Sequence, residues 1–424
     1  MERNNVILIT MDAVRPDRLS CYGYDKIKTE GIDIIAKSGV IFKNCIATSC
    51  LTPVAHASIL SGKNPDKTKL RDPFNVVRTT LISEILKKQG YDTAGFIGID
   101  LIDSKHRFNR GFDHFDEPTE KGSFHTMWFK EENQKLKANL GSWWVDRMFR
   151  WLKNHANNPF FIWGHYFHVH FLAEKELLFA GELDKNEYYD YAYYDAKIKY
   201  MDKKLFQPLV KLLKDLDIWD DTTIIVTSDH GETLGTKNPS WKTFFFEYPQ
   251  HKTMYESDLK IPLIIKNKNL KSQEINHTVR AIDIVPTIIG LLKISSTEDF
   301  DGINLVPLMN GGKLPELIAY SEELFEKRGP GSIQSLRTNN YKLIRNVTKN
   351  QEEFYDIEND PEEMKNIIDT SDPSLIKLIN EFRNVLSKMY NSYKKKTATS
   401  REEKTRMEKL MIKKLVKKLD LKQN

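Results

Sequence analysis

Near its amino terminus the chain reads Asn5-Val-Ile-Leu-Ile-Thr-Met-Asp12. The run is apolar except for Thr10, and a carboxylate follows it directly. Such a run is typical of a strand that is buried on both faces of a parallel sheet. Open α/β sheets bind ligands at the carboxyl ends of their strands, which is where Asp12 would lie. A lone aspartate there is more often a helix cap or turn residue, so Asp12 needs partners to be a ligand.

Apolar runs of strand length recur after this stretch and alternate with helix-like patterns. The expected strands cover residues 91–99, 160–164, 223–227 and 261–265, and the expected helices cover residues 32–37, 54–60, 81–88, 194–216 and 282–292. Strands that alternate with helices are typical of a parallel sheet covered on both faces. The sequence therefore predicts an α/β fold, a doubly wound and mostly parallel sheet flanked by helices.

After about residue 310 the pattern changes to short strand-like pieces. These cover residues 317–321, 332–338, 341–345 and 353–355, with a turn signal at Asn339-Asn340, and a helix is expected at residues 374–390. We expect a small C-terminal subdomain with an antiparallel sheet. The expected organisation is a catalytic α/β domain at 1–310, the small α+β subdomain at 311–392 and a basic helical tail at 393–424.

The composition excludes several classes of protein. With 424 residues, of which 40% are hydrophobic and 29% charged, the chain is neither disordered nor limited to a single small core. A formal net charge of +5 does not favour nucleic acid as a partner. Three cysteines without a CxxC spacing indicate neither a disulfide framework nor a zinc knuckle. Because the first apolar stretch is too short for a signal peptide or a membrane span, we expect a cytoplasmic location.

The tail from residue 397 onward is rich in lysine. Its apolar residues recur at helical spacing, at Met407, Leu410, Met411, Leu415 and Leu419. We expect a helix that packs on the protein or on a partner subunit, as in a homo-oligomer. The alternatives are a contact with a membrane surface, without any transmembrane segment, and disorder.

A second segment, Thr52-Pro-Val-Ala-His-Ala-Ser-Ile-Leu-Ser-Gly62, has the features of a helix start. Pro53 suits the first helical position and Thr52 the cap before it. Thr52 could therefore be an ordinary helix cap. It could equally be a nucleophile, because free amides and the helix dipole favour an anion at a helix amino terminus.

Two further segments carry polar residues of the metal-binding or catalytic kinds. Thr227-Ser-Asp-His-Gly-Glu232 places Asp229 and His230 at the end of an expected strand, as Asp12 is placed after the first one. A cation shared by the two carboxylates is therefore expected. The other segment includes His165-Tyr-Phe-His168-Val-His170, where His168 and His170 would share a face if the chain is extended.

With these motifs in this order, the chain resembles the sulfatase family of the alkaline phosphatase superfamily along nearly its whole length. Residues 5–23 resemble the opening strand and loop of the family, residues 52–62 its nucleophile helix and residues 228–232 its metal loop. C-terminal landmarks of the family are matched at residues 279–291, 301–302, 337–344 and 354–361. The resemblance implies an alkaline phosphatase-like fold.

The resemblance also implies roles for individual residues. Asp12, Asp229 and His230 would be ligands of a divalent metal ion, and Thr52 would be the metal-bound nucleophile. His170 would contact the transferred group. His251, four residues before Tyr255, would orient the substrate, protonate the leaving group or help to bind a second metal ion.

The chain departs from the formylglycine sulfatases at the nucleophile. Those enzymes have a Cys or Ser, a Pro two residues later and an Arg four residues later, where this chain has Thr52, Val54 and His56. Cys50 does not fit that spacing either. Ala13 replaces the second of the paired aspartates often found in the family. The remaining set looks more like that of threonine-dependent phosphodiesterases, phosphonate hydrolases and phosphoglycerol transferases.

The expected function is therefore a metal-dependent hydrolase that cleaves phosphate, phosphodiester, phosphonate or sulfate esters. The catalytic candidates are Thr52, His56, His170 and His251, and the metal-ligand candidates are Asp12, Thr52, Asp229 and His230. The expected cofactor is Mn, Zn, Mg or Ca, and the substrate a small-molecule or a glycan- or lipid-linked ester. The alternatives are a sulfatase without formylglycine, a phosphoglycerol-type transferase and a catalytically silent scaffold with the same fold.

Overall fold

The computed structural model of the chain describes residues 4–71, 75–118, 143–171, 191–234, 253–324 and 332–394. Within these residues the largest element is an eight-stranded sheet with the order β4-β3-β5-β1-β6-β7-β2-β8. Its strands are β1 (Asn5–Met11), β2 (Gly39–Ile46), β3 (Asp92–Ile97), β4 (His114–Asp116), β5 (Phe160–Tyr166), β6 (Thr222–Ser228), β7 (Lys260–Lys266) and β8 (Gln273–Arg280). β1 is parallel to both neighbours, β5 and β6, whereas β7 is antiparallel to β6 and β2. The predicted α/β fold with a mostly parallel sheet is confirmed.

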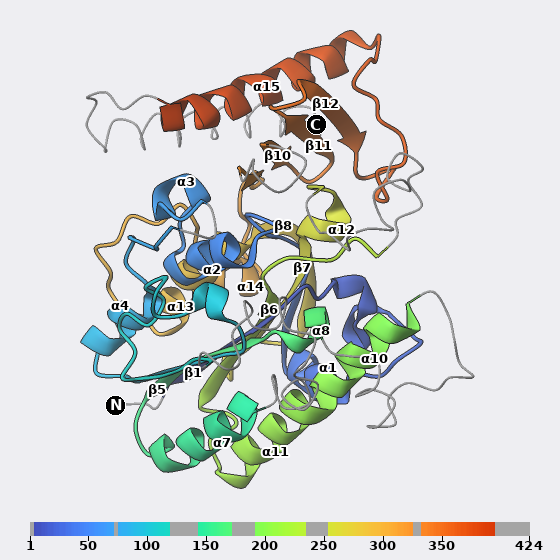
Figure 1. Ribbon diagram of the computed structural model, residues 1–424. Helices are drawn as coiled ribbons and strands as arrows, with labels where there is room; N and C mark the ends of the chain where they lie inside the picture. Colours follow the sequence, from blue (N-terminus) through green and yellow to red (C-terminus); the bar gives the residue numbers. More distant parts are fainter. Residues whose placement is uncertain are drawn as a thin grey trace, which may run out of the picture.

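Helices cover both faces of this sheet (Figure 1). One face carries α1 (Glu30–Lys37), α7 (Trp143–His155), α10 (Ala192–Met201) and α11 (Gln207–Asp215), and the other carries α2 (Thr52–Ser61), α4 (Ile82–Lys88) and α13 (Ile284–Leu291). The central strand serves both layers, because successive side chains of a strand point to opposite faces. Ile7 and Ile9 pack in the core under α1, α7, α10 and α11. Val6 and Leu8 pack in the core under α2, α4 and α13. All seven residues of β1 are buried.

The C-terminal part forms a second, antiparallel sheet, which has four strands among the described residues. The strands are β9 (Ala319–Glu323), β10 (Ile333–Arg337), β11 (Tyr341–Asn346) and β12 (Gln351–Asp356), and they are covered by α15 (Pro373–Lys394). Figure 1 shows this unit above the main sheet, with α15 on its outer side. The first strand is anchored beside the segment that leads into α2, since the Glu322 amide donates to the Thr48 carbonyl at 2.9 Å.

Buried charges join the two sheets. Lys342 of β11 is fully buried, and its Nζ lies 3.1 Å from Glu256 Oε1 and 2.9 Å from Glu363 Oε1. Glu256 begins the short helix α12 (Glu256–Leu259), which leads directly into β7 of the main sheet. Arg337 of β10 approaches the same carboxylate at 3.3 Å. The two sheets are therefore connected by buried polar contacts.

Most of the expected elements are present, and the differences have physical reasons. The expected helix 194–216 is interrupted by a π-helical turn at Asp202–Phe206, where the Asp202 carboxylate accepts the Gly31 and Ile32 amides of α1. His168 and His170 would share a face only in an extended segment, and this condition is not met, because the chain after β5 forms the short helix α8 (His168–Phe171). The lysine-rich tail lies outside the described residues.

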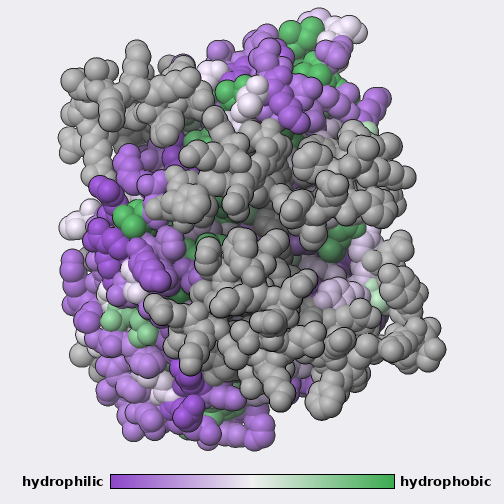
Figure 2. Space-filling model, in the orientation of Figure 1, coloured by the Kyte–Doolittle hydropathy of each residue, from purple (hydrophilic) through white to green (hydrophobic). Residues whose placement is uncertain are grey.

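The described surface seen in Figure 2 is mostly hydrophilic, with hydrophobic residues in small separate groups. Among the described residues, no helix combines the length and the apolar character that crossing a membrane requires. Cys21, Cys45 and Cys50 are all free thiols.

Candidate metal centre

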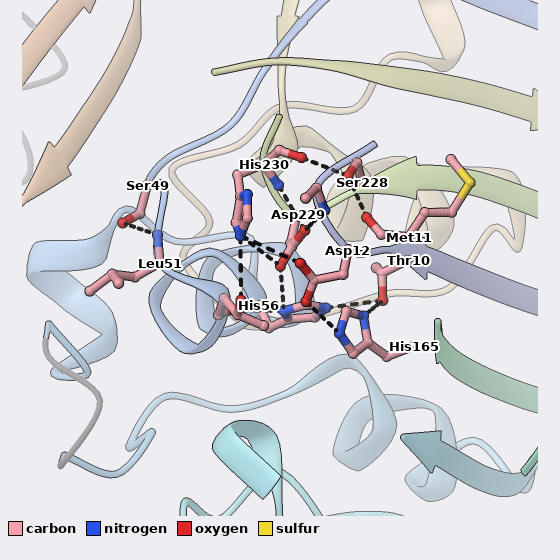
Figure 3. A network of polar contacts seen from close by, with 12 residues as sticks. Thr10, Met11, Asp12, Ser49, Leu51, His56, His165, Ser228, Asp229 and His230 are labelled. Carbon is pink, nitrogen blue, oxygen red and sulfur yellow. Dashed lines mark hydrogen bonds and ion pairs between the residues drawn. The ribbon is translucent and has the colours of Figure 1, made fainter. Parts of the chain in front are cut away.

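Three of the expected ligands meet at the carboxyl edge of the main sheet. Asp12 follows β1, and Asp229 and His230 follow the neighbouring strand β6. Each offers one ligand atom, and these atoms lie within 4.8 Å of one another. All three side chains are fully buried. Figure 3 shows them pointing toward a common centre, as the parallel pairing of β1 and β6 requires.

Backbone amides hold the Asp229 carboxylate in place. Its Oδ1 accepts the amides of Ala13 at 3.2 Å and His230 at 2.9 Å. Ala13 has a left-handed backbone (φ 58°), which turns the chain after β1 so that its amide can reach Asp229. The second oxygen, Oδ2, is left without a hydrogen-bond partner among the described residues.

The Asp12 carboxylate shows most directly that a cation fits here. Neither of its oxygens has a hydrogen-bond partner among the described residues, although both are buried. Burial and then the charge of Asp229 hold the pKa of Asp12 well above its usual range. Two adjacent carboxylates with unused lone pairs need a positive charge between them, either a proton or a metal ion. The donors are of the kinds that divalent metal ions accept in proteins.

The ring of His230 is oriented by its own loop. Its Nδ1 lies 2.8 Å from the Gly231 carbonyl, which can only accept, so Nδ1 carries the proton. The Nε2 lone pair then faces Asp229 Oδ2 at 3.4 Å and Asp12 Oδ1 at 3.8 Å. Ligands of a tetrahedral metal site with bonds of about 2.0–2.2 Å lie roughly 3.3–3.6 Å apart. The spacing therefore suits one cation.

Thr52 lies at the edge of this cluster, at the amino terminus of α2. The helix begins at Thr52 itself, with Leu51 as the cap, one residue earlier than expected. Thr52 Oγ1 is 3.4 Å from His230 Nε2, and the side chain is 6% exposed. Thr52 is therefore the least enclosed of the clustered hydroxyl, carboxylate and imidazole groups, as a nucleophile that has to meet a substrate should be.

His56, one helical turn after Thr52, is fully buried behind it. Its Nδ1 lies 2.8 Å from the Thr52 carbonyl and its Nε2 3.0 Å from Thr10 Oγ1. Burial and then the neighbouring His165 lower the pKa of His56 to about 3. A neutral ring with both nitrogens engaged cannot replace the charge of the arginine found here in formylglycine sulfatases. The geometry instead places His56 where its Nδ1 hydrogen bond holds the Thr52 backbone.

The structure adds one residue that the sequence analysis did not select, His165 at the end of β5. It pairs in register with Thr10 of β1 and is fully buried. Its Nε2 lies 3.3 Å from Asp12 Oδ2. Its place at a strand end, like those of Asp12 and Asp229, was a signal that the sequence already contained.

The remaining candidates are placed only in part. His168 is 6% exposed, and burial and then Lys197 lower its pKa to about 3. The backbone of His170 lies in α8, but its side chain is outside the described part of the structure, as is all of His251. Cys50 is fully buried, and burial raises the pKa of its thiol well above the usual range, so it is a poor nucleophile.

Comparisons with known proteins identify the family of the chain. Residues 4–294 match the model of the sulfatase family, and residues 245–392 match the N-sulphoglucosamine sulphohydrolase C-terminal family. The uncharacterized sulfatase YidJ of Escherichia coli (strain K12) is 24% identical over 92% of this chain and 86% of its own length. A Delta 4,5-hexuronate-2-O-sulfatase of Bacteroides thetaiotaomicron is 23% identical over 91% of this chain and 88% of its own.

Solved structures show the same fold. The crystal structure of the phosphonate monoester hydrolase of Agrobacterium radiobacter superposes with a TM-score of 0.72 at 18% identity, over 92% of this chain and 96% of that one. The family match spans both strands that carry Asp12 and Asp229, and α2 with Thr52. The chain thus belongs to the sulfatase family, a family of hydrolases with the fold of the alkaline phosphatase superfamily.

Proposed function

We propose that this protein is a metal-dependent hydrolase that cleaves phosphate, phosphodiester, phosphonate or sulfate esters with Thr52 as its nucleophile. One observation carries the proposal. The Thr52 hydroxyl lies 3.4 Å from His230 Nε2, beside two buried carboxylates. Both oxygens of Asp12 and the Oδ2 of Asp229 lack hydrogen-bond partners among the described residues. A Mn, Zn, Mg or Ca ion held by Asp12, Thr52, Asp229 and His230 would lower the pKa of the hydroxyl and offset charge on the ester.

The proposed reaction has two displacement steps at phosphorus or sulfur. Thr52 Oγ loses its proton to solvent and attacks in line, so that a Thr52 ester forms as the bond to the leaving alcohol breaks. The departing oxygen takes up a proton, for which His170 and His251 are the proposed donors. Water then attacks the same centre and releases the acid product, and Thr52 regains its proton.

The local fold supports both steps. First-turn amides of a helix have no intrahelical partners, so the Thr52 and Val54 amides of α2 can donate to the charged ester oxygens, whereas Pro53 between them has no N–H. His56 holds the Thr52 carbonyl through its Nδ1 proton and so fixes the hydroxyl relative to this amide group. A neutral imidazole does this without competing for the anionic substrate.

Thr52 as the nucleophile favours phosphorus esters over sulfate esters as substrates. A threonine cannot form the aldehyde hydrate on which formylglycine sulfatases depend, whereas a hydroxyl attacks phosphodiesters and phosphonates directly. Sulfate esters are the second candidate, because the curated relatives are named as sulfatases. Transfer to a sugar or lipid alcohol instead of water is a variant of the same chemistry.

The first prediction tests Thr52. Thr52→Ala should abolish turnover of bis(p-nitrophenyl) phosphate while the stability changes by only about 1 kcal/mol, because the Thr52 hydroxyl contacts His230 Nε2 at 3.4 Å and contributes no more than an ordinary hydrogen bond. Ser58→Ala on the same helix is the control, since the Ser58 hydroxyl is buried but has no hydrogen-bond partner among the described residues. Turnover, urea unfolding and the intact mass of the trapped Thr52 ester are the measurements. A Thr52→Ala variant with near wild-type turnover would refute the assignment.

A substrate panel separates the remaining readings. The purified protein, supplied with each metal ion in turn, is assayed on p-nitrophenyl esters of phosphate, sulfate, phenylphosphonate and on the phosphodiester. We expect the diester or phosphonate to be fastest. Faster sulfate turnover would support a sulfatase without formylglycine. If the protein binds metal but turns over none of the esters, with or without glycerol as acceptor, the result would support a catalytically silent scaffold protein with the same fold.

A further inference from the structure

A chain of hydrogen bonds behind the metal centre determines where each proton lies, beginning at His56. The Thr52 carbonyl at 2.8 Å can only accept, so His56 Nδ1 is the donor. A second proton on this fully buried ring would be a buried charge whose nearest carboxylate, Asp229, is 3.8 Å from Nδ1. His56 Nε2 is therefore an acceptor. The Thr10 hydroxyl, 3.0 Å away, has to supply the proton.

The Thr10 hydroxyl has one proton and two lone pairs. A longer contact of 3.4 Å to the Gly164 carbonyl competes for the proton, but only the bond to His56 prevents two lone pairs from facing each other at 3.0 Å. The oxygen then has two lone pairs left for two donors. The Trp163 indole N–H donates to it at 3.2 Å, and His165 Nδ1 lies at 3.0 Å. His165 Nδ1 must therefore carry a proton.

This assignment leaves His165 Nε2 as a bare lone pair inside the molecule. The ring is fully buried, and Nε2 has no hydrogen-bond partner among the described residues. It lies 3.3 Å from Asp12 Oδ2, which likewise has none. With His56 and Asp229, His165 also forms a group whose ligand atoms lie within 4.8 Å of one another, and this group shares Asp229 with the group of Asp12, Asp229 and His230. Acceptors aimed at one another in this way repel unless a positive charge lies between them (Figure 3).

We propose that His165 is a further ligand of the metal ion through Nε2, in addition to Asp12, Thr52, Asp229 and His230. The inference rests on the proposed metal-dependent function and deepens it. Two imidazoles, two carboxylates and a hydroxyl favour Zn, Mn or a similar transition-metal ion over Ca or Mg, which prefer oxygen ligands alone. Thr10 would orient the ligand from behind, as outer hydrogen bonds do for histidine ligands.

The test counts imidazoles on the ion. Chelator-treated protein is reloaded with one equivalent of Zn²⁺ and studied by X-ray absorption at the zinc edge, with Zn²⁺ affinity measured by competition against a chromophoric chelator. We expect two imidazoles in the wild type and one in His165→Gln, with affinity at least 10–100-fold weaker. His155→Gln is the control, because it removes a histidine at the end of α7, near the opposite end of β5. His155→Gln should leave both the number of imidazoles on Zn²⁺ and the Zn²⁺ affinity unchanged.

A second variant protects the test against misfolding. Thr10→Val keeps the His165 ring but removes the hydroxyl that fixes its proton, so affinity should fall about 10-fold or more while a metal still binds. If His165→Gln does not fold, nitrogen NMR of histidine-labelled wild type replaces it, and Zn²⁺ should shift Nε2 of two histidines. One imidazole in the wild type, or two in His165→Gln, would overturn this inference alone. Failure of the wild type to bind any divalent metal would overturn the proposed function itself.

Discussion

The imidazole of His168 is buried without the network that holds His56 and His165. It is 6% exposed, its Nδ1 has no hydrogen-bond partner among the described residues, and its ring lies 5.7 Å from that of Tyr166. Burial and then the positive charge of Lys197 lower its pKa to about 3, against about 6.5 for a free histidine. The folded protein therefore keeps His168 neutral in weak acid, where the unfolded chain would protonate it.

This difference predicts how acid affects stability. Between about pH 6.5 and pH 3 the unfolded state binds one more proton at His168 than the native state, so stability falls as the pH falls. In His168→Gln the slope of unfolding free energy against pH should be smaller by up to about 1.4 kcal/mol per pH unit. Urea unfolding of metal-free wild type and variant at pH 6.5, 5.5 and 4.5 measures it. Equal slopes in the two proteins would contradict the prediction.

At the same scale, the sequence predicted some of the site and not the rest. Asp12 and Asp229 were found because strand-end carboxylates on neighbouring parallel strands must converge. The proposed metal binding by His165 depends on which ring nitrogen holds a proton, which follows from contacts with Thr10 and not from spacing along the chain. The neutral state of His56 likewise follows from complete burial, which no local pattern reveals.

Among the elements, the loop after β6 depends on close backbone packing at Gly231. A Cβ added there would lie 2.1 Å from the Ser257 carbonyl oxygen, and the Gly231 amide donates to the Asp258 carbonyl at 2.7 Å. The loop that carries Asp229 and His230 is thus pressed against the segment that includes α12. Only glycine allows this approach, which gives the motif a packing reason as well as a chemical one.

We therefore expect Gly231→Ala to weaken Zn²⁺ binding by at least 10-fold, because the backbone contact cannot relax without moving His230. The stability should also fall by about 1–3 kcal/mol, the usual cost of overpacking. Gly311→Ala is the control for metal affinity, since nothing lies within 4 Å of the added methyl group. The left-handed φ of 82° at Gly311 is strained for alanine and should cost about 1–2 kcal/mol of stability without changing Zn²⁺ binding. Competition with a chromophoric chelator gives the Zn²⁺ affinity, and urea unfolding gives the free energy of unfolding. Unchanged metal affinity in a folded Gly231→Ala protein would show that the loop adapts.

How well each helix or strand could be predicted from the sequence depended on its length and its burial. The runs that became β1, β5 and β6 were recognised because strands covered on both faces are continuously apolar. β8 was missed because polar residues interrupt it, and the antiparallel direction of β7 cannot be read from its own residues. The helical turn of α8 was missed because four residues carry too little periodicity.

For the whole molecule, the buried charges around Lys342 link the stability of the two sheets. Lys342→Met would leave Glu256 and Glu363 facing each other without their shared cation, at a cost of about 3–5 kcal/mol. Both sheets should still unfold in one calorimetric transition, at a lower temperature. Lys211→Met, which breaks an ion pair with both side chains more than half exposed (76% and 56%), should cost under about 1 kcal/mol. Two separate transitions in the wild type would argue against this coupling.

The distribution of the proposed metal ligands over strands that are distant in the sequence also has a kinetic consequence. Asp12, His165 and His230 become neighbours only after β1 has paired with both β5 and β6. These pairings are long-range, so we expect them to form late in folding. An ion that binds only the native sheet should stabilise the native state and not the folding transition state. It should therefore slow unfolding about 100-fold when its concentration is 100 times its Kd, and leave the folding rate unchanged. Stopped-flow unfolding and refolding with Zn²⁺ or chelator would show this, and a faster refolding limb with Zn²⁺ would mean that the ligands assemble early.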